Sequence, residues 1–416
     1  MKQLALILIT LCAFPVLGQQ TISLEECYNL AAKNYPLVKQ MQLLKTQHEL
    51  DNAVISNSRL PQLNLNAQVT YQSDVTEVPI ANSNIEPLNN DQYRATLSVN
   101  QLIYNGGTTN AFLKQQSARL KTKQKQIEVS LYQLKQQINQ LYFSILLSQE
   151  TTLLLNAKES QLKATLNEVK AGVKYGALLP ASDKILEAEL IKIKQQFIEI
   201  KNTKATLIET LSGLIGQNLN TSTKIKQPLI KASLTTKIKR PELDLFQYKK
   251  EEIGSSETLL AKQIAPKILG FATGGYGNPG LNMLDNSFQP FYTVGVKLNW
   301  NVFDWNTNKK QRKSLVINKE IIDNEVEIFK LNTNIELHKQ QQEINKITLI
   351  IDTDLEIIKL RKEVLETAAS QLKNGVITSS AYSTELTNLY EAENTLIKHK
   401  IQLQLAKANY RVIKGS

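Results

Sequence analysis

Side chains that commonly do chemistry are few in this chain and are scattered along it. The three histidines, His48, His338 and His399, all fall in segments of helical pattern, and none has a cysteine or carboxylate at the spacing of a metal site. We therefore expect them to lie solvated on helix faces. The glycine-rich stretch Gly274–Gly277 is followed by a loop rather than a helix, so it lacks the context of a phosphate-binding loop. The sequence predicts no enzyme, no metal site and no cofactor.

The first residues have the pattern of an export signal. A short basic start, Met1-Lys2, precedes an apolar run from Leu4 to Leu17, which is too short to span a bilayer with its flanks. We therefore assign residues 1–18 to a signal peptide. Its removal would leave Cys27 as a single cysteine, so the exported chain would be held together by packing rather than by disulfides.

The chain is basic, with a formal net charge of +11 at pH 7. Its lysines are spread among Glu and Gln along segments of helical pattern, which is typical of solvated helix faces. The sequence therefore predicts no nucleic-acid partner. After the export signal, no segment has the roughly 18 uninterrupted apolar residues of a membrane helix. Any insertion into a membrane would have to use strands.

The sequence is organised as two similar halves. Matching residues recur 199 positions apart, as Gly176 and Gly375 do. Residues 217–240 are rich in Asn, Thr, Ser and Pro and read as a linker. We predict a first repeat over 19–216 and a second over 241–416, each made of a helix, two strands and two long helices.

Two segments, 108–171 and 296–374, contain neither glycine nor proline. A helix of about 65 residues is about 100 Å long. Apolar residues recur every seven positions, with one break at Ser148, which predicts left-handed packing of helix on helix. They are Leu113, Leu120, Ile127, Leu134, Leu141, Leu155, Leu162 and Val169 in the first half and Leu337, Ile344, Ile351, Ile358, Leu365 and Leu372 in the second. We expect tight turns near 172–180 and 375–379. A plain coiled-coil spacer would show the same periodicity.

Four runs alternate apolar and polar residues one by one, the pattern of a strand with two different faces. They cover 63–72, 93–100, 268–276 and 292–302, and glycines weaken the third. Each is near the 9–11 residues with which a tilted strand crosses a bilayer. Aromatic residues gather at their ends, as they do at the interfaces of transmembrane barrels. These residues are Tyr71, Tyr93, Tyr104, Tyr276, Trp300, Phe303 and Trp305.

The strands alone leave two interpretations open. The strands of a soluble sheet with one solvent-exposed face show the same alternation of apolar and polar residues. Four strands cannot close a barrel, however, and an open sheet edge does not occur in lipid. If these strands lie in a membrane, several chains must therefore contribute strands to one barrel.

With these features established, the chain resembles the TolC-like outer-membrane efflux proteins over essentially its whole length after the export signal. The leading helix, which we expect to begin at Ser23 with Glu26 completing a capping box, is one carrier of the resemblance. The other carriers are Leu60–Leu63, Gln101–Gly107, Trp300–Trp305 and the region from Ala171–Val173 to Glu187–Glu189. Each motif is weak alone, and their duplicated order is specific.

The resemblance implies a mainly α fold with transmembrane β structure. A long coiled-coil α-helical barrel would continue from a twelve-stranded β-barrel, to which each protomer of a homotrimer gives four strands. The protein would lie in the outer membrane of a Gram-negative-type cell, contact outer-membrane lipid and extend into the periplasm. It would be the passive exit duct of a tripartite efflux or type I secretion system, with a periplasmic adaptor (membrane fusion protein) and an inner-membrane pump as partners. The alternative is a non-conducting periplasmic coiled-coil scaffold or adhesin.

The resemblance also implies functional residues at the helical hairpin tips. Family members often carry acidic residues six positions after the turn glycine, around the periplasmic aperture. Here those positions hold Ser182 and Ala381, a departure from the pattern. The remaining aperture candidates are Asp183, Glu187, Tyr382 and Glu385, and the expected adaptor contacts are at Gly172, Gly176 and Gly375.

Overall fold

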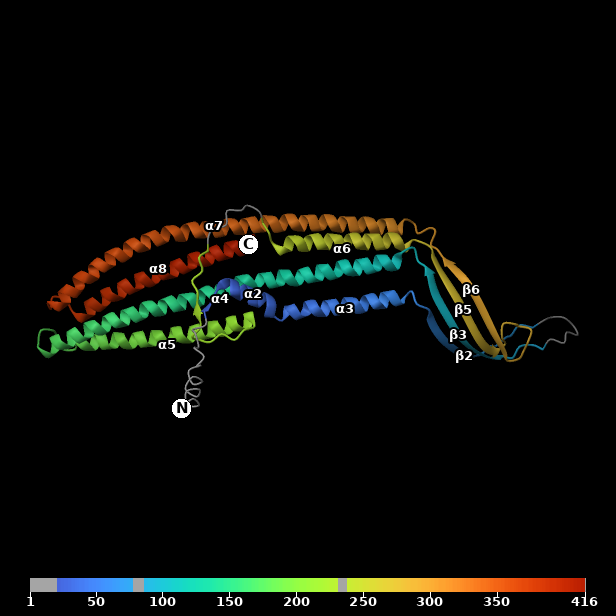
Figure 1. Cartoon of the computed structure of the whole chain (residues 1–416), viewed down its shortest axis with the longest axis horizontal. Helices are drawn as coiled ribbons and strands as arrows, with labels where there is room; N and C mark the ends of the chain where they lie inside the picture. Colours follow the sequence, from blue (N-terminus) through green and yellow to red (C-terminus); the bar gives the residue numbers. More distant parts are fainter. Residues whose placement is uncertain (1–20, 78–85, 231–237, 416) are drawn as a thin grey trace, which may run out of the picture. The chain divides into compact units, whose positions relative to one another are not determined.

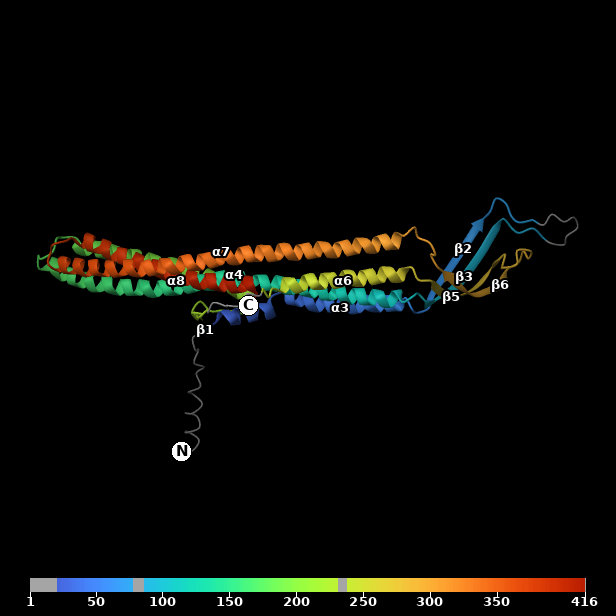
Figure 2. The same cartoon turned by 90° about the horizontal axis from the view of Figure 1, so that it is seen from above.

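The computed structural model describes residues 21–77, 86–230 and 238–415. Within these ranges the chain is mainly helical, with one four-stranded sheet and one pair of two-residue strands (Figures 1 and 2). The expected signal peptide lies outside the described residues. The chain divides into two compact units. One consists of Lys39–Gln126 and Glu242–Glu327, and the other of the described parts of Met1–Val38, Ile127–Pro241 and Ile328–Ser416.

Two very long helices dominate the structure, as the sequence predicts. Helix α4 spans Thr108–Lys174 and helix α7 spans Thr307–Lys373, and each has 67 residues. Each is followed by a tight turn and a second long helix, α5 (Ser182–Ile215) or α8 (Ser379–Lys414). The first residues of α4 and α7 lie 199 positions apart, the same spacing that relates the two halves of the sequence.

The segment before the first long strand is a pair of helices, so the expectation of one helix there is wrong. Helix α2 spans Leu24–Asn34, and its predicted capping box of Ser23 with Glu26 is confirmed. Helix α3 spans Leu37–Asn57. The break comes at Pro36, which lacks an N–H and pushes Tyr35 into an extended conformation. The second half has helix α6 (Pro241–Gln263) before its strands.

The four expected strands form one antiparallel sheet in the order β2-β3-β5-β6. Their bounds are Gln62–Tyr71 for β2, Asp91–Tyr104 for β3, Lys267–Asn278 for β5 and Gln289–Asn299 for β6. The expected extension of the last strand to Val302 is wrong. Strand β5 begins at Lys267 opposite Asn299, so a longer β6 would have no partner on that strand.

One face of this sheet is apolar and exposed. Residues directly opposite each other share a face, and side chains two apart along a strand do too. Leu65 therefore lies on the same face as Leu97 and Tyr292. Eight large apolar residues of this face are between 49% and 78% exposed: Leu63, Leu65, Val69, Leu97, Tyr292, Val294, Val296 and Leu298. An apolar patch of this extent indicates a surface that is covered in the functional state.

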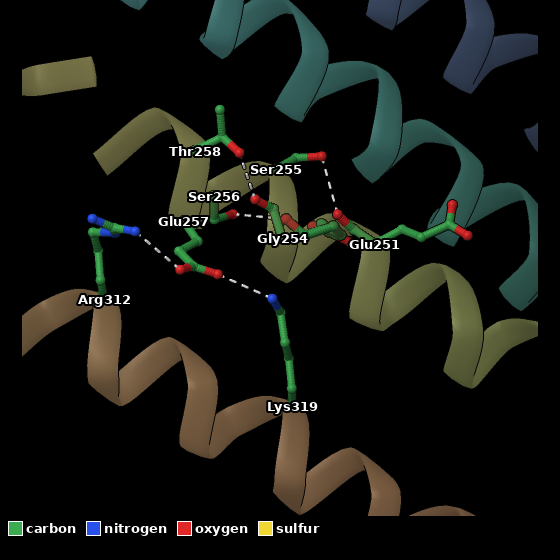
Figure 3. A network of polar contacts seen from close by, with 9 residues as sticks. Glu251, Gly254, Ser255, Ser256, Glu257, Thr258, Arg312 and Lys319 are labelled. Atoms are coloured by element: carbon green, nitrogen blue, oxygen red, sulfur yellow. Dashed lines mark hydrogen bonds and ion pairs between the residues drawn. The ribbon is translucent and has the colours of Figure 1, made fainter. Parts of the chain in front are cut away.

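Polar contacts fasten the helices next to the sheet. Glu257 of α6 accepts from Lys319 at 3.0 Å and from Arg312 at 3.3 Å, both on α7 (Figure 3). These two cations, Lys319 above all, hold the pKa of Glu257 below its ordinary value. Gln115 of α4 donates to the Ser256 hydroxyl of α6 at 3.0 Å. Helix α6 is thus tied to both long helices within one unit.

The other unit has a conventional apolar core. Helix α2 packs with α4, α5 and α8 around fully buried residues such as Ile138, Tyr142 and Leu211. Two short strands that the sequence does not indicate, β1 (Thr21–Ile22) and β4 (Lys224–Ile225), pair in parallel beside this core. Cys27 is completely buried here, and burial raises its pKa to about 12.

In the described part of the chain, no helix pairs enough length with enough apolar character to span a membrane.

Candidate functional site: the hairpin tips and the sheet

The turn between α4 and α5 depends on two glycines. Gly176 has φ +72°, in the left-handed region that favours glycine. A Cβ on Gly172 would lie 2.7 Å from Cδ1 of Leu178, so a larger residue there would have to displace this leucine side chain. The Gly172 carbonyl accepts from the N–H of Ala177 at 2.8 Å and that of Leu178 at 3.1 Å. The predicted turn is confirmed at this place.

The turn between α7 and α8 repeats this design with a shorter loop. Gly375 has φ +70°, and the N–H of Val376 donates to the Gln371 carbonyl at 2.8 Å. Thr378 then begins α8 as its N-cap, because its hydroxyl accepts from the N–H of Ala381 at 3.2 Å. The sequence-predicted turn at 375–379 is confirmed.

The acidic candidates of the first hairpin are neutralised by lysines. Glu187 accepts from Lys184 at 2.9 Å and forms an ion pair with Lys170 of α4, also at 2.9 Å. Hydrogen bonds from Lys184 and then from Lys170 lower the pKa of Glu187 to about 2. Asp183 lies 3.5 Å from the same Lys184. Two cations and two carboxylates thus balance each other at this tip.

The candidates of the second hairpin have different surroundings. Tyr382 is 2% exposed, and its hydroxyl lies 3.2 Å from that of Thr165 in α4. It borders a small cavity of about 120 Å³ that Gly172 also lines. Glu385 accepts from Arg361 of α7 at 3.3 Å and from Asn388 at 3.2 Å. The structure therefore joins Asp183 to Glu187 through a lysine, while Tyr382 faces α4 and Glu385 faces α7.

Sequence reasoning missed a buried polar pair in the second hairpin. Nδ1 of His399 lies 2.6 Å from Oδ2 of Asp354, whose side chain is 9% exposed. The expectation that all three histidines are solvated is therefore wrong for His399. A signal was present, because Asp354 falls on one seven-residue repeat with the buried residues Ile347 and Ala368. A carboxylate at such a core position needs a partner.

The candidate interface aromatics are all exposed and fall into two groups. Towards the loop ends of the strands, Tyr93 and Tyr276 lie 5.9 Å and 5.6 Å from the ring of Phe288. Towards the helices, Phe303 contacts Trp305 edge-on at 4.9 Å. The seven residues are between 40% and 79% exposed: Tyr71, Tyr93, Tyr104, Tyr276, Trp300, Phe303 and Trp305. Exposed aromatics thus mark both ends of the apolar face.

Comparisons with known proteins agree with this architecture. Residues 27–216 match the sequence profile of the family described as "Outer membrane efflux protein". No curated protein matches the chain. Three solved outer-membrane proteins share the fold at low identity, and each alignment covers 94% of this chain. They are VceC of Vibrio cholerae (14% identity, TM-score 0.64, 96% of that chain covered), CmeC of Campylobacter jejuni (14%, 0.64, 85%) and MtrE of Neisseria gonorrhoeae in its open state (15%, 0.65, 89%).

The profile covers most of the first half of the sequence, and the fold similarity extends over both halves. The expected fold class is confirmed, with long paired helices continuing from a sheet of four strands per chain. The expected location in the outer membrane, with an extension into the periplasm, also holds. Residues 27–216 thus match the outer membrane efflux protein family, and the chain as a whole has the fold of solved outer-membrane channels.

Proposed function

We propose that the protein is a homotrimeric exit duct through which substrates pass from the periplasm to the exterior, and that it has no catalytic role. The observation that carries this proposal is the sheet of four strands with one exposed apolar face. Its order places β2 and β6 at the two edges, and neither has an outer partner among the described residues. Unpaired backbone groups cost several kcal/mol each in lipid. Three sheets joined edge to edge would form a closed barrel of twelve strands.

The dimensions of the sheet support a place in the membrane. Strand β2 has 10 residues and β6 has 11. At about 3.3 Å per residue and a tilt of about 40°, such strands cover about 25 Å, the height of the apolar band of an outer-membrane barrel. The two groups of exposed aromatics would then lie at the two lipid–water interfaces.

Exposed apolar side chains at the hairpin tips support a protein partner there. Three apolar side chains are exposed there: Tyr175 at 80%, Leu179 at 65% and Val376 at 69%. A groove of about 670 Å³ also opens along the α7–α8 hairpin beside Leu360 and Glu385. We propose that a periplasmic adaptor contacts these tips at Gly172, Gly176 and Gly375 and links the duct to an inner-membrane pump.

We further propose that Asp183, Glu187, Tyr382 and Glu385 lie around the periplasmic aperture. Two lysines already balance the charge of Glu187, whereas Asp183 has one longer contact with Lys184. Replacing Asp183 with Ala should therefore shift the ion selectivity of the pore or weaken its block by cations. Unchanged selectivity and block would remove Asp183 from the aperture.

The duct is tested by the mass of the protein in detergent and its conductance in planar bilayers. A trimer that conducts is expected.

A matched pair of variants, Val294→Arg and Thr293→Arg, tests which sheet face meets lipid. Val294→Arg on the apolar face should prevent insertion, because an arginine facing the bilayer centre costs about 2–4 kcal/mol. Thr293→Arg on the opposite face should insert and conduct. A water-soluble monomer that never conducts would favour the scaffold or adhesin.

A further inference from the structure

The polar face of the sheet carries charge of one sign only. Across the four strands, all of which are described, the charged residues are Asp91, Arg94, Lys267 and Lys297. Side chains two apart along a strand share a face, as do directly paired residues. The register places the three cations on the polar face, with Arg94 opposite Gly277, Lys267 opposite Asn299 and Lys297 opposite Leu269. Asp91 pairs with Tyr71 and lies on the apolar face.

Arg94 is held in place by neutral groups. One guanidinium nitrogen donates to the Gly280 carbonyl at 3.4 Å, and the guanidinium carbon lies 5.6 Å from the centre of the Phe291 ring. This ring lies against Gly275, where a Cβ would come within 2.4 Å of it. A carbonyl and an aromatic face attract the cation but do not cancel its charge. Arg94 therefore adds a fixed positive charge to the polar face near its loop end.

The two lysines lie at the opposite end of the same face. Lys267 and Lys297 are diagonal neighbours in the register, a placement in which Cβ atoms are about 7 Å apart. Neither forms an ion pair with any described residue. Like charges this close repel each other unless an anion or solvent screens them. An anion close to both ammonium groups would be attracted by the two charges together.

Between the two positive ends the polar face offers neutral hydrogen-bonding groups. Asn64, Asn66, Thr96, Ser98, Thr273 and Thr293 lie here, and the Thr273 hydroxyl donates to that of Ser98 at 3.2 Å. Hydroxyl and amide groups can donate to a passing anion without holding it tightly. The face therefore combines positive charge at both ends with a weakly binding stretch between them, as conduction requires.

We propose that this face makes the strand segment of the duct selective for anions, and that the preferred cargo is anionic. The inference rests on the proposed trimeric duct, in which the polar face lines the pore. Each copy then contributes three cations and no carboxylate to the strand lining. Rings of Arg and Lys select anions in pores, and low-dielectric walls strengthen their field. Solutes bearing carboxylate, phosphate or sulfate groups are the chemical class that this lining favours.

The test measures reversal potentials of the trimer in planar bilayers under a KCl gradient. Wild-type protein should pass chloride in preference to potassium. The triple variant Arg94→Gln/Lys267→Gln/Lys297→Gln should lower the chloride-to-potassium permeability ratio by about threefold or more. The charge-conserving control Lys267→Arg/Lys297→Arg should keep the wild-type ratio. Detergent mass identifies any variant that fails to assemble.

A second measurement needs no variant. Selectivity that arises from lining charges should weaken when the mean KCl concentration rises from about 0.05 M to about 1 M, because the Debye length shrinks to about 3 Å. The inference would be overturned if the wild-type pore conducts but prefers potassium. It would also be overturned if the selectivity is changed neither by the triple variant nor by the salt concentration. In both cases the proposed duct function would still stand. A wild-type protein that never conducts would instead contradict the proposed function.

Discussion

The two helical hairpins, α4–α5 and α7–α8, share a backbone plan but differ at one buried place. In the first hairpin Leu155 is fully buried, and Ile200 packs in the same apolar cluster. The residues 199 positions later are Asp354 and His399, which contact each other at 2.6 Å. The same helix pairing thus accepts either an apolar pair or a polar pair. Burying Asp354 and His399 removes both side chains from water, which costs free energy. Their mutual contact offsets this cost, so removing either residue would leave the other buried without a partner.

The two corners where strand passes into long helix differ in a similar way. In the first half the corner residues are Gly106 and Gly107, with φ +63° and +83°. In the second half Trp305 and Asn306 adopt φ +55° and +58° at the equivalent places. The backbone turns in the same direction, but glycine adopts this conformation without strain and tryptophan does not. The two halves therefore keep the same backbone conformation at this corner although their residues differ.

The largest effect is expected from breaking the polar pair of the second hairpin. His399→Leu leaves Asp354 buried without its partner, and should lower the free energy of unfolding by about 3 kcal/mol. Urea unfolding followed by circular dichroism in detergent measures this. The double variant Asp354→Leu/His399→Ile copies the first hairpin and should stay within about 1 kcal/mol of wild type. A double variant as unstable as His399→Leu would refute the equivalence of the two hairpins.

A smaller loss is expected at the glycine corner. In Gly106→Ala the new Cβ would lie 2.0 Å from Cβ of Ala265, and φ would remain positive. Steric overlap and backbone strain together should cost about 2 kcal/mol in the same unfolding measurement. A Gly106→Ala protein as stable as wild type would mean that Ala265 moves away freely.

The neighbouring glycine separates backbone strain from overlap. At Gly107 a Cβ would meet nothing within 4 Å, so Gly107→Ala should cost only about 1 kcal/mol. In the second half, Asn306→Gly should change stability by about 0.5 kcal/mol or less, because asparagine tolerates this conformation. Equal losses for Gly106→Ala and Gly107→Ala would show that strain alone sets the cost of this corner.

The smallest effect concerns pH and the tip of the first hairpin. The pKa of Glu187 is lowered from 4.5 to about 2, so its favourable interactions are complete above pH 4.5 and are lost as the pH falls towards 2. Wild type should therefore lose slightly more stability than Glu187→Gln across this window. NMR titration of the Glu187 carboxyl should give a midpoint near 2. The midpoint should rise towards the ordinary value in Lys170→Gln/Lys184→Gln, and an unchanged midpoint would exclude the two lysines as its cause.

Much of the fold was predictable because its signals are local. The capping box at Ser23, the turns at Gly176 and Gly375 and the alternation of the strands are patterns within a few residues. Two predicted boundaries were wrong, one because of a local residue and the other because of a partner strand that is distant in the sequence. Pro36 is a local break that went unrecognised, whereas the end of β6 at Asn299 depends on where β5 begins.

The candidate site was less predictable because its chemistry depends on pairing between elements. Lys184 and Glu187 are three positions apart, so their contact is visible in the sequence. The contacts of Glu187 with Lys170 and of Glu385 with Arg361 require the hairpins to be folded. The burial of Tyr382 against Thr165 likewise joins residues 217 positions apart.

The sequence by itself determined the repeated plan of this protein: two long helical hairpins, four strands with an apolar and a polar face, and aromatic residues at the strand ends. These follow from periodicity, which fixes the face on which each side chain lies. Only the tertiary structure decided which charges meet. It paired Glu187 with two lysines, buried Asp354 against His399 and gathered Arg94, Lys267 and Lys297 on one face. The physical reason is that electrostatic interactions depend on distance in space, and neighbours across strands and helices are set by register and packing.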